Sequence, residues 1–390
     1  MVLKKLAIIS THPIQYNAPF FALLHKRAKL ALKVFYTWSQ AVKGEKYDPG
    51  FGTTVHWDIP LLDGYPWEAV NNTSEKPGSE HYHGIINPGL IEAVSDFNPD
   101  AILVYGWNFK SHFILMRHFK GKIKVIFRGD STLLNEEGLL KTMLRKMALR
   151  FVYHYIDYAL YVGKANKAYF RFAGLQERQM VFMPHAVENS RFASCETKTE
   201  EIAELKKQWK IPPQNLVLLY SGKLTTNKNI HSLCIAIAAL QHKPVSLLIA
   251  GSGPLGEKLK KDFAHHPQII FLGFQNQERI PLLYAIADLV VLPSKKKNET
   301  WGLCLNEGMA AGKAVIASDG CGAAYDLVEH GMNGYVFPVN DFGKLQEHVA
   351  FLADRPELVK KMGEASKKII SDYSFEKGCM ALEKLMEDIS

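Results

Sequence analysis

The amino-acid sequence predicts an α/β protein made of two doubly wound domains, each built on a buried parallel sheet. Three observations carry this prediction. The chain has 390 residues, which is enough for about two or three domains of ordinary size. Short continuous runs of valine, isoleucine and leucine alternate with helix-length segments, as expected of parallel strands buried on both faces. One polar stretch near the middle of the chain interrupts this alternation.

The predicted strands are spread over both halves of the chain. Each is a short apolar run that precedes a polar or glycine-containing segment, which is the usual end of a buried strand. In chain order the strands are Leu6–Ser10, Lys33–Tyr36, Ala101–Tyr105, Lys124–Arg128, Tyr158–Val162, Val181–Met183, Leu216–Ser221, Ser246–Ala250, Ile269–Leu272, Leu289–Leu292 and Ala314–Ala317.

The domain boundary is predicted in the polar stretch. Residues Ser194–Gln208 carry mixed charge, and a Pro-Pro pair follows before the next buried strand begins. We therefore assign residues 1–190 to an N-terminal Rossmann-like domain, 191–214 to a linker and 215–372 to a C-terminal Rossmann-like domain. Residues 373–390 are assigned to a C-terminal helix, for which packing back on the N-terminal domain is left open.

Composition places the chain among globular proteins. Hydrophobic residues make up 47% and charged residues 22%, which excludes a disordered chain. No run approaches 18 apolar residues, so no membrane-spanning helix is expected, and the apolar run Leu6–Ile9 is too short for a signal-peptide core. The five cysteines form no C-x-x-C pair, which is typical of reduced thiols in a cytoplasmic protein.

The net positive charge of the chain resides in its first half. Residues 1–195 hold 24 lysines and arginines against 16 acidic residues, the whole net charge of +8, whereas residues 196–390 are balanced. This asymmetry favours an anionic partner, such as a membrane surface, nucleic acid or a pyrophosphate-bearing substrate. Nucleic acid is not expected, because the basic and aromatic residues form no recognisable binding module.

A basic amphipathic helix is predicted over residues 138–155. Five apolar residues fall on one helical face, and four basic residues lie on the others. Two interpretations stand: a core-packing helix with solvated basic residues, or a helix that lies on the anionic inner face of a membrane. The apolar set is Leu140, Leu144, Met147, Phe151 and Tyr155, and the basic set is Lys141, Arg145, Lys146 and Arg150.

The most specific chemical signal is the segment Glu299–Ala317. Two glutamates, Glu299 and Glu307, stand eight positions apart with Gly302 between them. A helix that begins near Leu303 would offer its first N–H groups and the positive end of its dipole to an anion such as pyrophosphate. Glu307 could then accept two hydrogen bonds from a ribose diol, and Glu299 could accept from sugar hydroxyls. On spacing alone, a capping Glu299 and a surface Glu307 remain the alternative.

This segment resembles the E-x7-E motif of glycosyltransferase family 4, whose members are retaining enzymes of the GT-B fold that use nucleotide-sugar donors. Glu299 and Glu307 occupy the two glutamate positions. The resemblance covers residues 215–340 and, more weakly, the N-terminal half. It implies two Rossmann-like domains that face each other across a cleft, with Glu299 among the catalytic residues. The donor site would include Thr300, Trp301, Gly302, Leu303 and Glu307, with Trp301 standing where phenylalanine is more usual.

Further segments resemble the family in the same order. Lys223 and Lys228 follow the first strand of the second domain, where the family has a basic loop that contacts the donor diphosphate. Two ammonium groups beside a helix N-terminus can offset pyrophosphate charge without a divalent metal, so both lysines are predicted to be catalytic. Gly251 and Gly253 resemble the nucleotide-side loop. Phe274 resembles the loop against the base, with a core position as its alternative.

The N-terminal domain offers polar side chains after two of its strands. Arg128 ends the fourth predicted strand and Asp130 follows it, near where many family members carry a functional histidine. Both are predicted to be catalytic, and an internal ion pair is the alternative. Four residues after the first strand are predicted to bind the acceptor: His12, Gln15, Tyr16 and Asn17. For His12 a structural role is the alternative.

The prediction is therefore a retaining, metal-independent glycosyltransferase. It would move a sugar from a nucleotide-diphosphate sugar, its donor substrate, to a glycan or lipid-linked acceptor, in bacterial cell-surface polysaccharide or glycoconjugate synthesis. No cofactor is expected, and no metal, because the His81/His83 and His265/His266 pairs lack further ligands at suitable spacing. Two alternatives remain: a nucleotide-sugar epimerase of GT-B fold, and a non-catalytic protein that binds anionic membranes.

Overall fold

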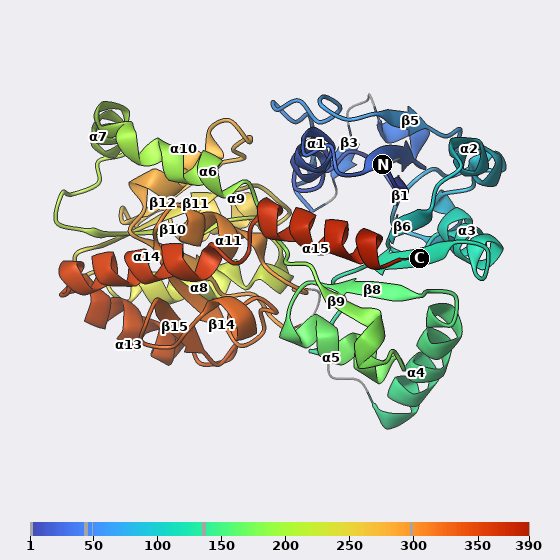
Figure 1. Cartoon of the computed structure of the whole chain (residues 1–390). Coiled ribbons are helices and arrows are strands. Elements are labelled where there is room, and N and C mark those ends of the chain that lie inside the picture. The colour runs from blue at the N-terminus through green and yellow to red at the C-terminus, as the bar shows by residue number, and fades with distance from the viewer. Residues whose placement is uncertain (1–2, 43–45, 49, 135–137, 297–298, 390) are drawn as a thin grey trace. The chain divides into compact units, whose positions relative to one another are not determined.

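The computed structural model describes residues 3–42, 46–48, 50–134, 138–296 and 299–389. The chain divides into two compact units (Figure 1). The first unit contains Met1–Lys46, Ile59–Pro184 and Phe375–Ser390. The second unit contains Tyr47–Asp58 and His185–Ser374. A short segment of the first half of the sequence therefore belongs to the second unit, and the C-terminal segment belongs to the first.

The first unit is built on a seven-stranded parallel sheet in the order β5-β2-β1-β6-β7-β8-β9. Its carboxyl ends therefore meet at one edge, and the strand order reverses between β1 and β6. The strands are β1 (Lys5–Ser10), β2 (Ala31–Tyr36), β5 (Trp67–Ala69), β6 (Ala101–Tyr105), β7 (Lys124–Arg128), β8 (Tyr158–Tyr161) and β9 (Met180–Phe182).

Helices cover both faces of this sheet. On one face, buried side chains of four helices pack on alternate strand residues such as Ile102 and Val104. These helices are α2 (Leu90–Phe97), α3 (Lys110–Phe119), α4 (Leu139–Tyr153) and α5 (Lys164–Phe172). Helices α1 (Ala18–Lys26) and α15 (Phe375–Asp388) pack on each other elsewhere in the unit, where Phe20 contacts Phe375.

The C-terminal helix is fixed to the first unit by a nearly buried ion pair. Arg27 donates from Nε to Oε1 of Glu383 at 2.5 Å and from Nη2 to Oε2 at 2.8 Å. This bidentate contact holds the pKa of the Glu383 carboxyl below its ordinary value, although partial burial opposes the shift. The pair therefore stabilises the docked position of α15.

The second unit is built on a six-stranded parallel sheet in the order β12-β11-β10-β13-β14-β15. Its strands are β10 (Leu216–Ser221), β11 (Val245–Ala250), β12 (Ile269–Gly273), β13 (Leu289–Leu292), β14 (Ala314–Ser318) and β15 (Gly334–Phe337). Its helices are α6 (Asn189–Ala193), α7 (Thr199–Gln208), α8 (Ile230–Ala238), α9 (Gly256–Asp262), α10 (Ile280–Ile286), α11 (Leu303–Ala310), α12 (Ala324–Leu327), α13 (Phe342–Ala353) and α14 (Pro356–Ile370).

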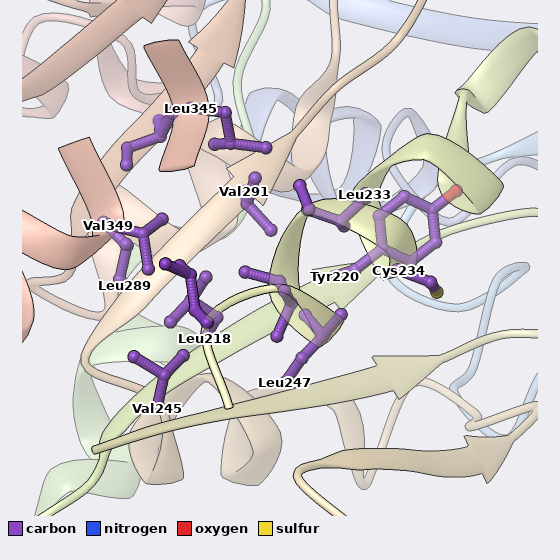
Figure 2. Close-up of a cluster of buried hydrophobic side chains, with 14 of the residues drawn as sticks. Leu218, Tyr220, Leu233, Cys234, Val245, Leu247, Leu289, Val291, Leu345 and Val349 are labelled. Atoms are coloured by element: carbon purple, nitrogen blue, oxygen red, sulfur yellow. The ribbon is translucent and has the colours of Figure 1, made fainter. Parts of the chain in front are cut away.

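The core of the second unit lies between its sheet and the helices α8 and α13. Figure 2 shows Leu218, Leu247 and Leu289 of the sheet directed towards Leu233 of α8 and Val349 of α13. All five side chains are inaccessible to solvent. This packing makes the sheet rigid, so the loops at the carboxyl ends of its strands have fixed starting points.

The 47–58 segment, Tyr47–Asp58, attaches to the second unit by hydrogen bonds. It includes most of a two-stranded ribbon, β3 (Lys46–Asp48) and β4 (Thr53–Val55). Ser252 donates from Oγ to the Phe51 carbonyl at 2.8 Å, and Asn276 donates from Nδ2 to the His56 carbonyl at 2.6 Å. The segment thus lies on the loops that follow β11 and β12.

The predicted strands agree with the observed ones to within two residues at each end. The sequence patterns missed the short strands β3, β4 and β5, and also β15. None of the helices in the described part of the chain is both long and apolar enough to cross a membrane.

The Arg27–Glu383 pair yields a stability prediction. We expect Glu383→Gln to weaken the docking of α15 by about 1.5–3 kcal/mol, the range for hydrogen bonds to charged groups. Because the Glu383 pKa is lowered in the folded state, the stabilisation is complete above the ordinary glutamate pKa of about 4.3 and declines as the pH falls through the lowered value. Hydrogen exchange of α15 in the full chain measures it.

The control for this prediction is Glu376→Gln, which changes an exposed residue of the same helix. Faster exchange of α15 in Glu383→Gln but not in Glu376→Gln is the expected result. Equal exchange in both variants at neutral pH would show that the pair does not hold the helix.

Candidate functional site

The strand order of the second unit reverses at β10, and this is where the candidate site lies. β10 pairs with β11 on one side and with β13 on the other. Connections that leave such a pair of neighbouring strands run to opposite faces of the sheet, which opens a crevice beyond their carboxyl ends. The residues that follow β10 and β13 therefore border this crevice.

Lys228 and Glu299 meet at this point. Lys228 follows β10 in a 3₁₀ turn, Thr226–Lys228, and Glu299 follows β13. The Lys228 ammonium contacts Oε2 of Glu299, and Ser294 donates its hydroxyl to the same oxygen at 2.6 Å. Glu299 is only 7% exposed. A buried carboxylate is thus paired with a cation and a hydroxyl at the reversal of strand order.

The environment keeps Lys228 charged. Burial alone would lower the pKa of this lysine, but the charge of Glu299 and its hydrogen bond outweigh burial and hold the pKa above the ordinary value. Lys228 therefore stays protonated at neutral pH.

Gly302 begins helix α11 beside Glu299. Its backbone is left-handed, with φ at +110°. A β-carbon at this position would lie 2.4 Å from Leu292 Cδ2 and 2.8 Å from Cys321 Sγ, and only 3.8 Å from Oε1 of Glu299. Glycine is required here for two reasons, the backbone angle and the lack of space. The N-cap of α11 therefore lies beside the Glu299 carboxylate.

Glu307 and Trp301 are buried within the second unit. Tyr284 of α10 donates its hydroxyl to Oε2 of Glu307 at 2.6 Å, and burial raises the pKa of Tyr284, which keeps it a donor. Trp301 donates from Nε1 to Asn306 at 2.8 Å. Both side chains therefore have partners inside the protein, whereas Thr300 and Leu303 are partly exposed.

Lys223 has an acidic partner that the sequence patterns did not indicate. Its ammonium lies 2.9 Å from the Asp48 carboxylate and 5.1 Å from the centre of the Phe51 ring. Burial opposes ionisation of Asp48, but hydrogen bonds from Lys223 and from backbone N–H groups lower its pKa below the ordinary value. The 47–58 segment thus places a carboxylate beside Lys223, one of the two lysines predicted to contact the donor diphosphate.

The glycine loop after β11 packs against the loop after β10. A β-carbon on Gly251 would lie 1.9 Å from the Gly222 carbonyl oxygen, and one on Gly253 would lie 2.8 Å from the backbone of Leu224 and from that of Gly50. Both glycines therefore permit close approach of backbones. Phe274, partly exposed after β12, meets Phe51 edge-on with ring centres 5.2 Å apart.

The residues predicted in the first unit lie at the carboxyl edge of its own sheet. His12 follows β1, where Thr11 Oγ1 lies 2.9 Å from its Nδ1, and it packs edge-on against Trp38. Gln15, Tyr16 and Asn17 are partly exposed in the same connection to α1. Because β1 and β7 are separated only by β6, Asp130 lies at the same edge.

Arg128 is buried at the end of β7. Its guanidinium donates to the carbonyl oxygens of Met183 and Pro184, at 2.9 and 3.0 Å. Burial lowers its pKa, and the two carbonyls accept one hydrogen bond from each terminal nitrogen of the guanidinium. These contacts fix the last residues of the first unit before the chain enters the second.

The described residues include no group of three or more histidine, cysteine, aspartate or glutamate side chains that could hold a metal ion. The prediction of metal-independent chemistry stays a prediction.

Part of the second unit matches a known family model. Residues 201–369 match the family model of glycosyl transferases group 1. This range contains every residue predicted for the donor site, including the Lys228–Glu299 pair and α11.

Curated relatives match over part of their length. N-acetyl-alpha-D-glucosaminyl L-malate synthase of Bacillus anthracis is 27% identical over 194 residues, which cover 48% of this chain and 50% of that protein. Lipopolysaccharide 1,2-N-acetylglucosaminetransferase of Salmonella typhimurium is 30% identical over 199 residues, which cover 47% and 51%. The chain spans about half the length, or less, of the curated relatives it matches.

Solved structures match over almost the whole chain. The complex of HepE from Anabaena with UDP and glucose has a TM-score of 0.70 at 18% identity, and covers 99% of this chain and 100% of that one. This likeness shows the fold. The predicted class, α/β with two Rossmann-like domains in the GT-B fold, is confirmed.

The space around Gly302 yields a prediction for the site. We expect Gly302→Ala to cost at least about 2 kcal/mol of stability, because a left-handed backbone costs about 1–3 kcal/mol and overpacking about as much again. Gly256→Ala is the matched control, since its new β-carbon would meet only Leu224 Cδ1, at an ordinary 3.6 Å. Thermal unfolding of both variants measures the difference. Equal melting temperatures would refute the proposed constraint.

Proposed function

We propose that this protein is a retaining, metal-independent glycosyltransferase of family 4. It would transfer a sugar from a nucleotide-diphosphate sugar to a glycan or lipid-linked acceptor, in the synthesis of bacterial cell-surface polysaccharides or glycoconjugates. The observation that carries the proposal is the Lys228–Glu299 pair beside the N-terminus of α11, at the reversal of strand order. The group 1 family match over the same residues supports it.

The donor diphosphate would lie at the start of α11. The helix N–H groups and the Lys228 ammonium carry positive charge, and the fold fixes the positions of both. They would stabilise negative charge on the diphosphate as it leaves. This interaction strengthens as the bond breaks, so it lowers the barrier rather than merely holding the substrate.

Glu299 would orient the transferred sugar. Its Oε2 holds Ser294 and Lys228, which fixes the carboxylate plane, and its Oε1 faces the start of α11. Hydroxyls of the sugar are suitable donors to such a fixed carboxylate. Glu307 and Tyr284 would support the nucleotide side of the same helix, where a ribose diol is the proposed partner.

The chemistry that we propose is a front-face displacement. The bond between the anomeric carbon and the diphosphate oxygen breaks, and the acceptor hydroxyl oxygen bonds to the same face of the sugar. The hydroxyl proton passes to the departing diphosphate oxygen, so no protein nucleophile is needed. His12, Gln15, Tyr16 and Asn17 would bind the acceptor from the first unit, and Asp130 would orient it. Arg128 would act indirectly, by fixing the backbone of Met183 and Pro184 at the end of the unit.

We place this activity in the cytoplasm, at the inner face of the membrane. The charge excess of the first half of the chain supports an anionic surface as a partner. One relative, alpha-monoglucosyldiacylglycerol synthase of Streptococcus pneumoniae, is named for a lipid product.

Donor binding is tested by thermal stabilisation and by turnover. Nucleoside diphosphates and their sugars that bind the folded chain raise its melting temperature according to RT ln(1 + [L]/Kd). We expect one nucleotide to stabilise the chain and Lys228→Gln to lose at least tenfold in affinity for it. The control is Lys243→Ala, which removes a lysine paired with Asp354 away from the site.

The outcomes separate the candidate functions. Release of nucleoside diphosphate that depends on an acceptor supports a transferase, whereas conversion of the donor sugar without an acceptor supports an epimerase. If no nucleotide in the panel shifts the melting temperature, the transferase proposal fails.

Asp48 yields a second prediction. The Asp48 carboxylate forms an ion pair with Lys223, so a diphosphate that binds Lys223 must compete with Asp48 for the ammonium group. We expect Asp48→Asn to tighten binding of the stabilising nucleoside diphosphate by about two- to fivefold, because partly exposed ion pairs contribute up to about 1 kcal/mol. Titration calorimetry against the wild type and Asp354→Asn, an exposed aspartate of the same unit, measures it. Weaker binding by Asp48→Asn would mean that Asp48 helps to form the site.

A further inference from the structure

Helix α4 exposes an unusual amount of apolar surface. Six of its large apolar side chains are more than half exposed, among them Leu139 at 87%, Leu140 at 73% and Met147 at 68%. The others are Met143, Leu144 and Phe151. Large exposed apolar side chains gathered on one element mark an interaction site, whereas isolated ones do not.

These six residues form one continuous stripe. At 3.6 residues per turn they fall within about 140° of the helix circumference. The residues that anchor α4 in the first unit, Leu149, Val152 and Tyr153, lie on the opposite side and all belong to its last two turns. The first two turns contain no buried residue. The apolar face identified in the sequence is therefore exposed over most of its length and not packed into the core.

Basic side chains flank the stripe on both edges. At the same helical spacing, Lys146 and Arg150 lie at one edge of the stripe and Lys141 lies beyond the other, whereas Arg145 lies on the side of the helix that is anchored in the unit. The helix contains no acidic residue. Arg145 lies over the Tyr169 ring and Lys146 over the Phe172 ring, so two of the basic residues of α4 contact aromatic side chains of α5. Figure 1 shows α4 and α5 next to each other in the first unit.

We propose that α4 is a docking surface for an anionic lipid bilayer. The apolar stripe would enter the boundary between headgroups and acyl chains, and the flanking lysines and arginines would contact lipid phosphates. This surface lies outside the proposed donor site, and it goes beyond the general membrane location stated above by assigning the contact to one helix face.

The charges favour a lipid surface over a second copy of the chain. A twofold contact between two α4 stripes would bring Lys141, Lys146 and Arg150 of one helix against the same three of its partner, with no acid on either helix to compensate. A bilayer that contains anionic lipid neutralises those charges and accepts the apolar stripe at the same time. A partner that offers only negative charge, such as nucleic acid, leaves the stripe in water.

Vesicle sedimentation of the full chain tests the proposal without any donor sugar, so its result is independent of the transferase activity. Vesicles of phosphatidylcholine with 30% phosphatidylglycerol are compared with pure phosphatidylcholine. We expect at least tenfold stronger partition into the anionic vesicles, with a decrease as salt is raised. The double variant Leu144→Glu/Met147→Glu should lose at least tenfold, and Lys141→Ala/Lys146→Ala should lose affinity for the anionic vesicles only.

Matched controls change equally exposed residues elsewhere. Ile235→Glu alters an exposed apolar residue of α8, and Lys258→Ala/Lys261→Ala alters two exposed lysines of α9. Both should partition as the wild type does. Absence of binding, or equal binding by the Leu144→Glu/Met147→Glu variant, would overturn the proposal. So would a dimer in light scattering that this double variant abolishes, because the stripe would then be covered by a second copy.

Discussion

The contact between Lys228 and Glu299 is the constraint on which the candidate site depends. A carboxylate as buried as Glu299 is costly unless a cation and a hydrogen-bond donor compensate it, and Lys228 and Ser294 supply both. Lys228 follows β10 and Glu299 follows β13, on either side of the strand reversal, so the contact between them joins the two halves of the sheet at its carboxyl edge. Because the sheet core is rigid, the positive charge stays where an anion would enter.

The position of the start of helix α11 depends on the same contact. Glu299 lies beside Gly302, whose left-handed backbone turns the chain directly into the helix. Tyr284 and Asn306 then hold Glu307 and Trp301 inside the unit, which fixes the direction of the helix. The positive end of the helix and the charge of Lys228 thus act at one point. The 47–58 segment adds a negative charge at Lys223 through Asp48. This ion pair links a distant part of the sequence to the loop that follows β10.

Much of this arrangement could be predicted from the sequence because it depends on strand order. Lys223, Lys228 and Glu299 all follow buried apolar runs, and parallel strands bring their carboxyl ends to one edge. The role of Asp48 could not be predicted, since its partner is 175 positions away and the short strands around it have no apolar pattern. The partners of Arg128 were equally hidden, because backbone carbonyls leave no signal in a sequence. For residues 138–155 the apolar periodicity correctly predicted a helix, α4. The same periodicity fits a buried and an exposed apolar face, so the sequence alone could not tell which of the two this face is.

A crystal structure of the chain with the nucleoside diphosphate that stabilises it most tests the central claim directly. The account predicts that the terminal phosphate lies at the N-terminus of α11, within hydrogen-bond distance of its first N–H groups and of the Lys228 ammonium. A nucleotide bound anywhere else, with Lys228 still paired only to Glu299, would contradict the account.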